Sequence, residues 1–384
     1  MPDPKSIDLD RHPPDARALD RIGIENALRF GVLPLRSAGA ITPVASPSLG
    51  RFRTAQRVLE AKLGPVACCL ADRQKIEDQI TRLRAPTLAV RATTRTAPVE
   101  SCRNWSGARA ATAAACLSVL LLLWAILWPV GLLWVVTGWA ALTLVSVTGL
   151  RTVAAVVEAR HARREQQTWT SRRPYQRVEA SQPVVSLLVP LFDEEDIAKR
   201  LVKRLERLDY PRSRLDVLLI LEANDMRTRK AIEDTDLPKW MRIITVPSGA
   251  VRTKPRALNF ALDFAHGEIV GIYDAEDAPA ADQLLRVVDT FRHAGPEVAC
   301  VQGVLDFYNA RQNWLTRCFT IDYATWFRLV LPGLVRLGFA IPLGGTTLFF
   351  RRDVLGLIGC WDAHNVTEDA DLGLRLARRG YKVA

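Results

Sequence analysis

The chain has 384 residues, 49% of them hydrophobic and 24% charged, so it can form two or three units that each bury a core. Its formal net charge of +11 is compatible with nucleic acid, an anionic membrane surface or a phosphorylated substrate as partner. Seven scattered cysteines without CxxC spacing indicate neither a disulfide framework nor a zinc site. The polar, proline-bearing N-terminus lacks the apolar core of a secretory signal, which predicts that the first part of the chain stays in the cytosol.

Residues 1–85 alternate short apolar runs with glycine and proline and end in an amphipathic helical pattern. This pattern predicts a small cytosolic α+β domain. No glycine-rich phosphate cradle is present in it, so a packing or docking role is the simplest interpretation. Residues 86–109 predict a linker, because Pro86, Pro98 and a threonine-rich run interrupt regular structure there.

Residues 110–150 contain no charged side chain. A single membrane crossing needs about 20 residues, so the sequence predicts a two-helix transmembrane hairpin over 110–155 with a turn near Trp128–Gly131. Arginines precede the run, and a basic juxtamembrane linker is predicted over 156–182, so both ends should face the cytosol. Attraction to acidic lipid then accounts for much of the positive charge, and no nucleic-acid partner is expected. One long tilted span, or a buried hairpin of a soluble protein, is the alternative.

After Pro183, leucine-rich or β-branched runs alternate with amphipathic helices, which predicts an α/β domain with a doubly wound, mostly parallel sheet. The predicted strands are VVSLLVPL, DVLLIL, MRIITV, EIVGIY and VACVQG (184–191, 216–221, 241–246, 268–273, 298–303). Ligands of such sheets bind beyond the carboxyl ends of the strands. The polar residues expected to form one site at those ends are Asp193, Glu194, Glu195, Glu222, Asp225, Lys254, Asp274, Glu276 and Asp277.

The residue types at these strand ends limit the chemistry. Neither a GxxxxGK[ST] cradle nor a GxGxxG turn follows the first strand, which argues against kinase-like and dehydrogenase functions. Asp274 and Glu276 stand two apart, a spacing at which both carboxylates can face one hard divalent cation such as Mg or Mn. Such a cation neutralises charge on a departing nucleoside diphosphate. The alternative is an ordinary solvated acidic turn.

Two further segments allow a structural and a functional interpretation. Thr367 can cap a helix whose first turn holds Glu368 and Asp369, and a carboxylate there can either stabilise the helix or act as a general base. The aromatic segment 312–338 predicts either an amphipathic pair lying on the membrane surface or a buried helix beneath an acceptor site.

Five motifs in order resemble glycosyltransferase family 2, of the GT-A fold. They are VSLLVPLFDEE, TKPRALNFAL, DAED, PLGGTTLFFRRDVLGLIGCWD and NVTEDADLGLRLARRGY, within the domain 183–384. Within the family, the chain resembles the membrane branch that includes cellulose-synthase-like enzymes and the inner-membrane partner of the phage N4 receptor.

The resemblance implies a role for each site residue. Glu194 and Glu222 would contact the base and ribose, Lys254 the nucleotide, and Asp274 and Glu276 the ribose and the metal, Mg or Mn. Asp369 would be the catalytic base, with Glu368 beside it. The implied activity is inverting transfer from a nucleotide diphosphate sugar, with a UDP-sugar favoured, to a growing polysaccharide or glycan. The implied place is the cytosolic face of the bacterial inner membrane, where membrane lipid and polysaccharide export proteins are the further partners.

The sequence departs from the family pattern in three places. Glu222 and Glu276 replace the usual aspartates and keep the charge on a longer arm. The chain stops before any QxxRW segment, so the domain is expected to be C-terminally incomplete. A catalytically silent nucleotide-binding membrane subunit of an export complex remains the alternative. The N-terminal region also resembles the N-terminal domain of some type II secretion ATPases, members of which bind a cyclic dinucleotide, so a sensor role stays open.

Overall fold

The computed structural model describes residues 6–37, 39–168, 182–194 and 198–384. Contacts divide the chain into two units. The first comprises Met1–Ala97, Val178–Asp289 and Phe349–Glu368, and the second comprises Pro98–Arg177, Thr290–Leu348 and Asp369–Ala384. The N-terminal region therefore shares a unit with much of the predicted α/β domain. Glu195 and part of the predicted basic linker, residues 169–181, lie outside the described residues.

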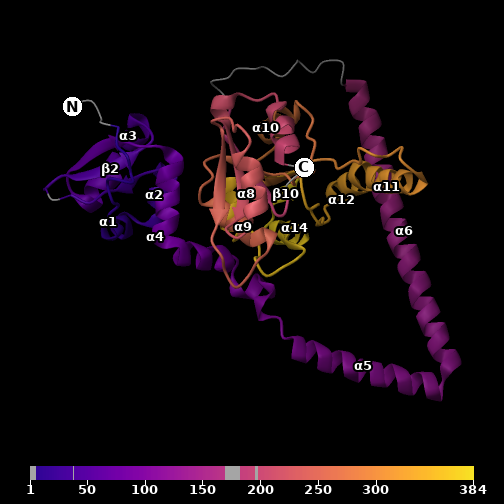
Figure 1. The fold of residues 1–384 in the computed structure, drawn as a ribbon. Coiled ribbons are helices and arrows are strands. Elements are labelled where there is room, and N and C mark those ends of the chain that lie inside the picture. The colour runs from indigo at the N-terminus through magenta and orange to yellow at the C-terminus, as the bar shows by residue number, and fades with distance from the viewer. Residues whose placement is uncertain (1–5, 38, 169–181, 195–197) are drawn as a thin grey trace. The chain divides into compact units, whose positions relative to one another are not determined.

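The N-terminal part of the first unit is a three-stranded sheet with helices, as the α+β prediction expects (Figure 1). β1 pairs with β2 in antiparallel fashion, and β2 pairs with β3 in parallel. Val44, Phe52, Leu59 and Ile76 are buried and form much of its core. The elements are α1 (Ala16–Ile22), α2 (Ile24–Phe30), β1 (Leu33–Pro34), β2 (Thr42–Ser46), α3 (Leu49–Leu63), β3 (Val66–Leu70) and α4 (Arg73–Thr94).

Helix α4 continues into the segment that the sequence assigns to a linker. It passes through Pro86 and departs from helical geometry at Arg84, with φ −130° and ψ 24°. Proline lacks an N–H and clashes with the preceding turn, so the kink falls just before it. Beyond the kink, Leu88 and Ala92 are buried, and α4 contacts α9 of the central sheet domain. Tertiary packing thus maintains a helix where proline favours a break.

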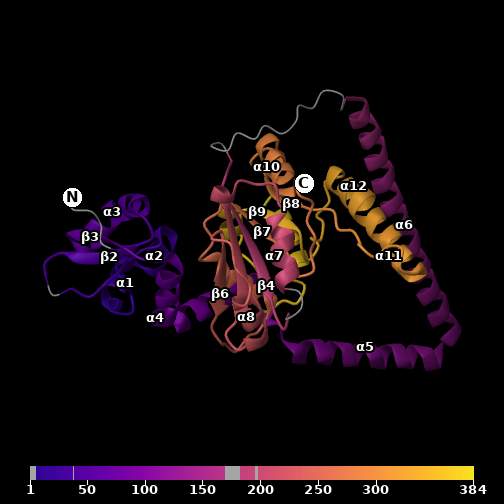
Figure 2. The ribbon, with the colours of Figure 1, turned by 45° about the horizontal axis from the view of Figure 1, so that its top comes forward.

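The central sheet has seven strands, and every pairing recorded for it is parallel. Strands β9, β7, β4, β5 and β6 follow one another in this order in the first unit, and β8 pairs with β10 in the second. Figure 2 labels β4, β6, β7, β8 and β9. All five strands predicted from the sequence are present, so the prediction of a mostly parallel α/β fold is confirmed. The strands are β4 (Val185–Leu191), β5 (Leu215–Glu222), β6 (Met241–Val246), β7 (Ile269–Ile272), β8 (Val298–Gln302), β9 (Leu348–Arg351) and β10 (Lys382–Val383).

Almost every residue of β4 and β5 is buried, which explains their near-continuous apolar runs. The helices of this part of the chain are α7 (Ala198–Glu206), α8 (Met226–Glu233), α9 (Lys254–Leu262), α10 (Gln283–His293), α13 (Arg352–Leu357) and α14 (Glu368–Arg378). Every residue of α9 from Pro255 to Leu262 is buried. This helix can therefore hold its first turn rigidly at the edge of the sheet.

Two helices are long and apolar enough to cross a membrane. They are α5 (Gly107–Leu127) and α6 (Pro129–Thr168), joined at Trp128 (Figure 1). Their most apolar windows have mean hydropathies of 2.4 and 1.9, and at most 6% of the residues in either window are buried. A core helix of a soluble protein would be mostly buried, so this exposure disfavours the buried-hairpin alternative.

The aromatic segment of the second unit forms α11 (Trp314–Thr325), a π-helical turn (Trp326–Val330) and α12 (Leu331–Arg336). No residue of α11 is buried, and Trp314 and Ile321 are among its exposed side chains, so α11 is not a buried helix. The segment packs on α6: a Cβ at Gly333 would lie 2.0 Å from the Ala154 carbonyl oxygen, so only glycine fits there. Exposed apolar side chains beside a candidate membrane span agree with the membrane-surface interpretation, which stays a prediction.

Candidate functional site

A cavity of about 430 Å³ lies at the carboxyl ends of β4, β5 and β7, beside the start of α9. All five residues that the sequence assigns to nucleotide or metal binding line it, namely Glu194, Glu222, Lys254, Asp274 and Glu276. Its other lining residues are Pro190, Leu191, Phe192, Ile220, Arg252, Thr253, Ala257 and Ala275. The cavity therefore combines an apolar wall with charges of both signs.

The charged pair in this cavity is Lys254 and Asp274. Lys254 Nζ donates to Asp274 Oδ1 at 2.5 Å, and each side chain keeps somewhat over a quarter of its surface exposed. Lys254 is the first residue of α9, and the preceding Thr253 Oγ1 donates to the Ala363 carbonyl at 2.7 Å. The start of α9 is thereby fixed, so the ammonium group has a defined position in the cavity.

In the acidic turn after β7, one carboxylate stabilises the turn and two others line the cavity. The Asp277 carboxylate accepts from the Asp274 backbone N–H at 2.8 Å, which closes the turn. Arg204 of α7 donates to the carbonyls of Glu276 and Asp277 at 2.7 and 3.2 Å. Asp277 thus stabilises the turn, whereas the side chains of Asp274 and Glu276 line the cavity.

Glu222 has a partner that sequence reasoning missed. Arg256 Nη1 lies 3.3 and 3.4 Å from the two carboxylate oxygens of Glu222, and Arg256 also donates to the Pro247 carbonyl. Burial raises the pKa of Glu222, while the Arg256 charge opposes this shift. Arg256 is itself fully buried, so the pair is preorganised. Its signal in the sequence is a second cation two residues after Lys254, in TKPR.

The loop after β4 is tied to α8 by backbone donors. The Asp193 N–H donates to Asp225 Oδ2, and the Glu194 N–H donates to Thr228 Oγ1, both at 2.8 Å. These bonds leave the Glu194 side chain in the cavity. Burial and the neighbouring charges of Glu276 and Asp193 raise the pKa of the Glu194 carboxyl.

The donor set of the cavity suits a divalent cation only in part. Among the described residues, no group of three or more His, Cys, Asp and Glu side chains is arranged to hold a metal. Asp274 and Glu276 offer two hard oxygen ligands at the cavity wall. Mg²⁺ is commonly held by one or two carboxylates together with substrate phosphates and water. These residues therefore fit a metal that arrives with a phosphate ligand.

Glu368 and Asp369, predicted to be catalytic, are not among the described residues that line this cavity. Glu368 begins α14 and is 8% exposed. Asp369 Oδ1 accepts from the Ala370 N–H at 2.8 Å, and its Oδ2 lies 3.4 Å from where a Cβ on Gly345 would stand. The Thr367 hydroxyl donates to Asn365 Oδ1 at 3.0 Å. The capping and catalytic interpretations of this turn both remain open.

Comparison with known proteins gives a match over the α/β part of the chain. A family model described as "Glycosyltransferase like family 2" matches residues 182–384, more than half of the chain. The beta-monoglucosyldiacylglycerol synthase of Nostoc sp. is 31% identical over 210 residues, covering 53% of this chain and 43% of that protein. Probable glucomannan 4-beta-mannosyltransferase 1 of Arabidopsis thaliana is 27% identical over 209 residues, covering 52% and 37%.

Among solved structures, the mannosyltransferase PcManGT from Pyrobaculum calidifontis, in complex with GDP-Man and Mn²⁺, is 23% identical. It covers 61% of this chain and 65% of its own, with a TM-score of 0.42. The chain spans less than half the length of the two curated relatives.

Proposed function

Because the chain belongs to glycosyltransferase-like family 2, we propose that it transfers a sugar from a nucleoside diphosphate sugar to a carbohydrate acceptor. The observation that supports this most is the convergence of Glu194, Glu222, Lys254, Asp274 and Glu276 on one cavity at the carboxyl edge of the sheet. A UDP-sugar is the proposed donor, since the family resemblance favours it.

Each part of the cavity has a proposed role in holding the donor. Glu222 and Glu194 bind the ribose and base, against the apolar wall that includes Phe192. Carboxylate oxygens accept hydrogen bonds, which suits contacts to the hydroxyl groups of a ribose and the imino group of a base. Lys254 and Arg252 face the diphosphate, whose charge they offset.

Asp274 and Glu276 are the proposed ligands of a divalent cation, Mg or Mn. The cation would neutralise the negative charge that develops on the departing nucleoside diphosphate. Without it, both carboxylates would face the diphosphate and repel it. When the donor binds, Lys254 can exchange its contact with Asp274 for a phosphate oxygen, because both side chains are partly exposed.

Asp369 is the proposed general base, with Glu368 supporting the same turn. Its carboxylate accepts the proton of the acceptor hydroxyl as that oxygen attacks the anomeric carbon. The new glycosidic bond forms while the bond from the anomeric carbon to the diphosphate oxygen breaks, and the configuration inverts. Asp369 is only partly buried, so an acceptor can reach it.

We further propose that the reaction takes place at the cytosolic face of a bacterial inner membrane, with α5 and α6 as the spans. Arg103 precedes α5 and Arg109 lies in its first turn, while Arg151, Arg160 and Arg163 lie in the C-terminal half of α6, which supports cytosolic placement of both ends. The relatives include both a lipid glycosyltransferase and a polysaccharide mannosyltransferase by name. A polysaccharide or glycan acceptor at the membrane surface is proposed here.

The test is a panel of nucleotide sugars added to the full chain in detergent, with and without Mg²⁺ or Mn²⁺. We expect one donor to raise the melting temperature only when metal is present, and to release nucleoside diphosphate slowly. Asp274→Ala should abolish both effects. Asp234→Ala, an exposed aspartate after α8, is the matched control. Full stabilisation in excess chelator would contradict the metal role, and binding without release would favour a catalytically silent subunit.

A further inference from the structure

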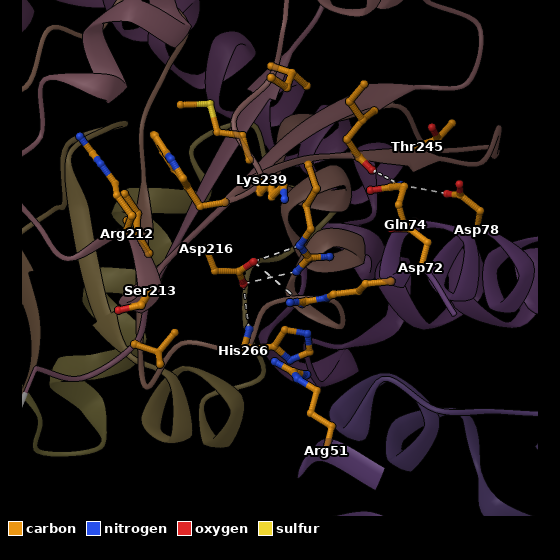
Figure 3. A pocket seen from close by; sticks show the side chains of 18 of the residues that line it. Arg51, Asp72, Gln74, Asp78, Arg212, Ser213, Asp216, Lys239, Thr245 and His266 are labelled. Atoms are coloured by element: carbon orange, nitrogen blue, oxygen red, sulfur yellow. Dashed lines mark hydrogen bonds and ion pairs between the residues drawn. The ribbon is translucent and has the colours of Figure 1, made fainter. Parts of the chain in front are cut away.

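A second and larger cavity lies at the opposite, amino edge of the sheet. Its volume is about 1170 Å³, and it is lined by Val184, Leu215 and Met241 at the starts of β4, β5 and β6. Arg51 of α3 and Arg73 of α4 line it from the N-terminal region. Figure 3 labels Arg51 among the lining side chains. The cavity is therefore built jointly by two regions of the first unit, and the donor cavity shares none of its lining residues.

The floor of this cavity is a buried and mutually neutralised charge cluster. Asp216 accepts from Arg242 Nε at 3.0 Å and from Ser186 Oγ at 2.7 Å. Glu77 accepts from Arg73 Nε at 2.9 Å and pairs with Arg242 as well. Two acids and two arginines thus offset one another, and Figure 3 shows Asp216 at the centre of several of these bonds. The floor has little net charge to offer a ligand.

The rim has cations without such partners. Among the charged lining residues, six are Arg or Lys and four are Asp or Glu. In the part of the chain that the structure describes, no hydrogen bond or ion pair is recorded for the side chains of Arg51 and Lys239. Arg212 stacks on Trp240, with its guanidinium carbon 4.7 Å from the ring centroid, and among the described residues its side chain donates only to the Glu206 carbonyl. When the paired charges of the floor are left out of the count, the other residues that line the cavity carry more positive than negative charge.

The acids at the rim offset part of this charge, since the four cations Arg51, Arg212, Arg229 and Lys239 face the three acids Asp72, Asp78 and Glu233. Asp72 caps α4 by accepting from the Lys75 N–H at 3.1 Å, and Asp78 accepts from Gln74 at 3.0 Å. Glu233 lies 3.7 Å from Arg229. Burial, together with the nearby charges of Arg73 and Arg242, lowers the pKa of Arg51, while the charges of Asp216 and Glu77 oppose this shift.

We propose that this cavity binds a phosphate-bearing small molecule, held by Arg51 on the N-terminal side and by Lys239 and Arg212 on the sheet side. Arginine forks match phosphate oxygens geometrically, and Trp240 offers an aromatic surface beside them. The volume exceeds what a phosphate alone needs, so the cavity has room for an organic part of the ligand. Because its contacts come from both regions, it stabilises the docking of the N-terminal region.

That docking surface leads towards the donor cavity. Asn259 of α9 donates to the Ala92 carbonyl of α4 at 2.9 Å and to the Trp361 carbonyl at 2.7 Å. Arg95, just after α4, pairs with Asp263 at the end of α9. The first residue of α9 is Lys254, which lines the donor cavity. A ligand that holds α4 therefore acts on the helix that positions Lys254.

The probe is inorganic pyrophosphate, titrated into the full chain in detergent at constant ionic strength. Excess EDTA is present, so that binding through a metal at the donor cavity does not contribute. We expect saturable binding and a raised melting temperature. Arg51→Gln and Lys239→Gln should each weaken binding at least about tenfold, the loss of one charge-assisted contact. Melting without pyrophosphate establishes that each variant is folded.

The matched control is Arg53→Gln, which removes the same charge from an exposed position of α3 and should bind like the unmodified protein. Absence of saturable binding would overturn the proposal. It would also be overturned if Arg51→Gln and Lys239→Gln bind as tightly as Arg53→Gln. If Lys254→Gln abolishes binding instead, pyrophosphate occupies the donor cavity, where Lys254 is the cation placed at the diphosphate, and the proposal is equally wrong.

Discussion

The two edges of the parallel sheet carry similar charged residues, but these residues differ strongly in how deeply they are buried. At the carboxyl edge, Asp274 and Lys254 are paired but each is more than a quarter exposed. At the amino edge, Asp216 and Arg242 are both at least 90% buried and are linked to Glu77 of α4. Burial lowers the solvent screening of a pair and raises the cost of breaking it. Charges at the carboxyl edge can therefore exchange partners with a ligand, whereas those at the amino edge hold two regions together.

The pKa directions agree with this difference. At the carboxyl edge, burial raises the pKa of Glu222 although Arg256 opposes the shift, and burial together with the charges of Glu276 and Asp193 raises the pKa of Glu194. At the amino edge, burial is outweighed by Arg242 and Arg73, which lower the pKa of Asp216 and Glu77. A carboxylate stabilised so strongly in its charged form is a structural ion. Only the cations at the rim of that cavity remain for a ligand.

The largest expected effect comes from breaking the amino-edge cluster. Glu77→Ala leaves Arg242 buried without one of its two acidic partners, so the free energy of unfolding should fall by about 3 to 5 kcal/mol. Donor affinity of the folded fraction should stay the same, since the donor cavity shares no residue with the cluster. Denaturant titration in detergent measures the first effect, and nucleotide-sugar binding measures the second.

Glu60→Ala, on the exposed side of α3, is the control for Glu77→Ala and should change stability by a few tenths of a kcal/mol at most. A loss below about 1 kcal/mol for Glu77→Ala would mean that the cluster behaves as a surface pair. The contrast between the two edges would then be wrong.

Removing a carboxylate from the carboxyl edge should lower activity and leave stability nearly unchanged, the opposite of the result expected for Glu77→Ala. Asp274→Ala is expected to lower turnover by about 10³-fold, because a charge that stabilises the departing diphosphate is lost with its metal. The free energy of unfolding should change little, since the Asp274–Lys254 pair is partly exposed. Activity and melting of one preparation test both statements. If Asp274→Ala is destabilised but still active, Asp274 has a structural role, and the contrast drawn between the two edges is wrong.

The pH dependence of stability gives a third test at the amino edge. Burial lowers the pKa of His266 to about 4, and the charges of Arg73 and Arg242 add to the shift, while Glu77 at 3.8 Å from Nε2 and Asp216 oppose it. Between pH 6.5 and 4 the unfolded chain binds a proton that the folded chain refuses. Stability should therefore fall by about 3 kcal/mol as the pH drops through that window.

His266→Gln should remove this part of the pH dependence, whereas His364→Gln should leave it intact. Unfolding curves at a series of pH values measure it. Below pH 4 a further loss is expected from Asp216, whose lowered pKa makes its stabilisation disappear as it is protonated. An identical slope for His266→Gln and the unmodified protein would show that this histidine is not held neutral by burial.

Local sequence predicts the carboxyl edge far better than the amino edge. Strands such as Val185–Leu191 are buried on both faces, so their apolar runs identify them, and polar residues after parallel strands must gather at one edge. That rule alone brings Glu222, Asp274 and Glu276 together. The family resemblance adds roles for them but no geometry.

The rest depends on contacts between distant parts of the chain. Arg242 and Glu77 are separated by 165 residues, and nothing in either neighbourhood predicts the pair. Helix α4 continues past Pro86 because Leu88 and Ala92 pack against the sheet domain, a tertiary effect that overrides a local break. The carboxylate of Asp277 accepts a backbone N–H within its own turn, a contact that the spacing of the acidic residues cannot reveal.

The smallest expected effect concerns Asp369, where a capping and a catalytic explanation of one carboxylate make different predictions. As a general base, Asp369→Asn keeps the size of the side chain but cannot accept a proton, so turnover should fall by about 10²-fold or more. Donor affinity should hardly change, because Asp369 is not among the residues that line the donor cavity. As a helix-terminal charge, the same substitution should cost only about 0.3 to 1 kcal/mol of stability, and activity should fall only as far as folding does.

Turnover, donor affinity and melting temperature of Asp369→Asn, measured on one preparation, separate these explanations. Asp371→Asn is the matched control, since Asp371 lies on the same helix and pairs with Arg375 at 2.8 Å. It should affect stability without a specific loss of turnover. If Asp369→Asn transfers sugar at a near-normal rate, its carboxylate only stabilises α14, and the base must be sought among the acids that line the donor cavity.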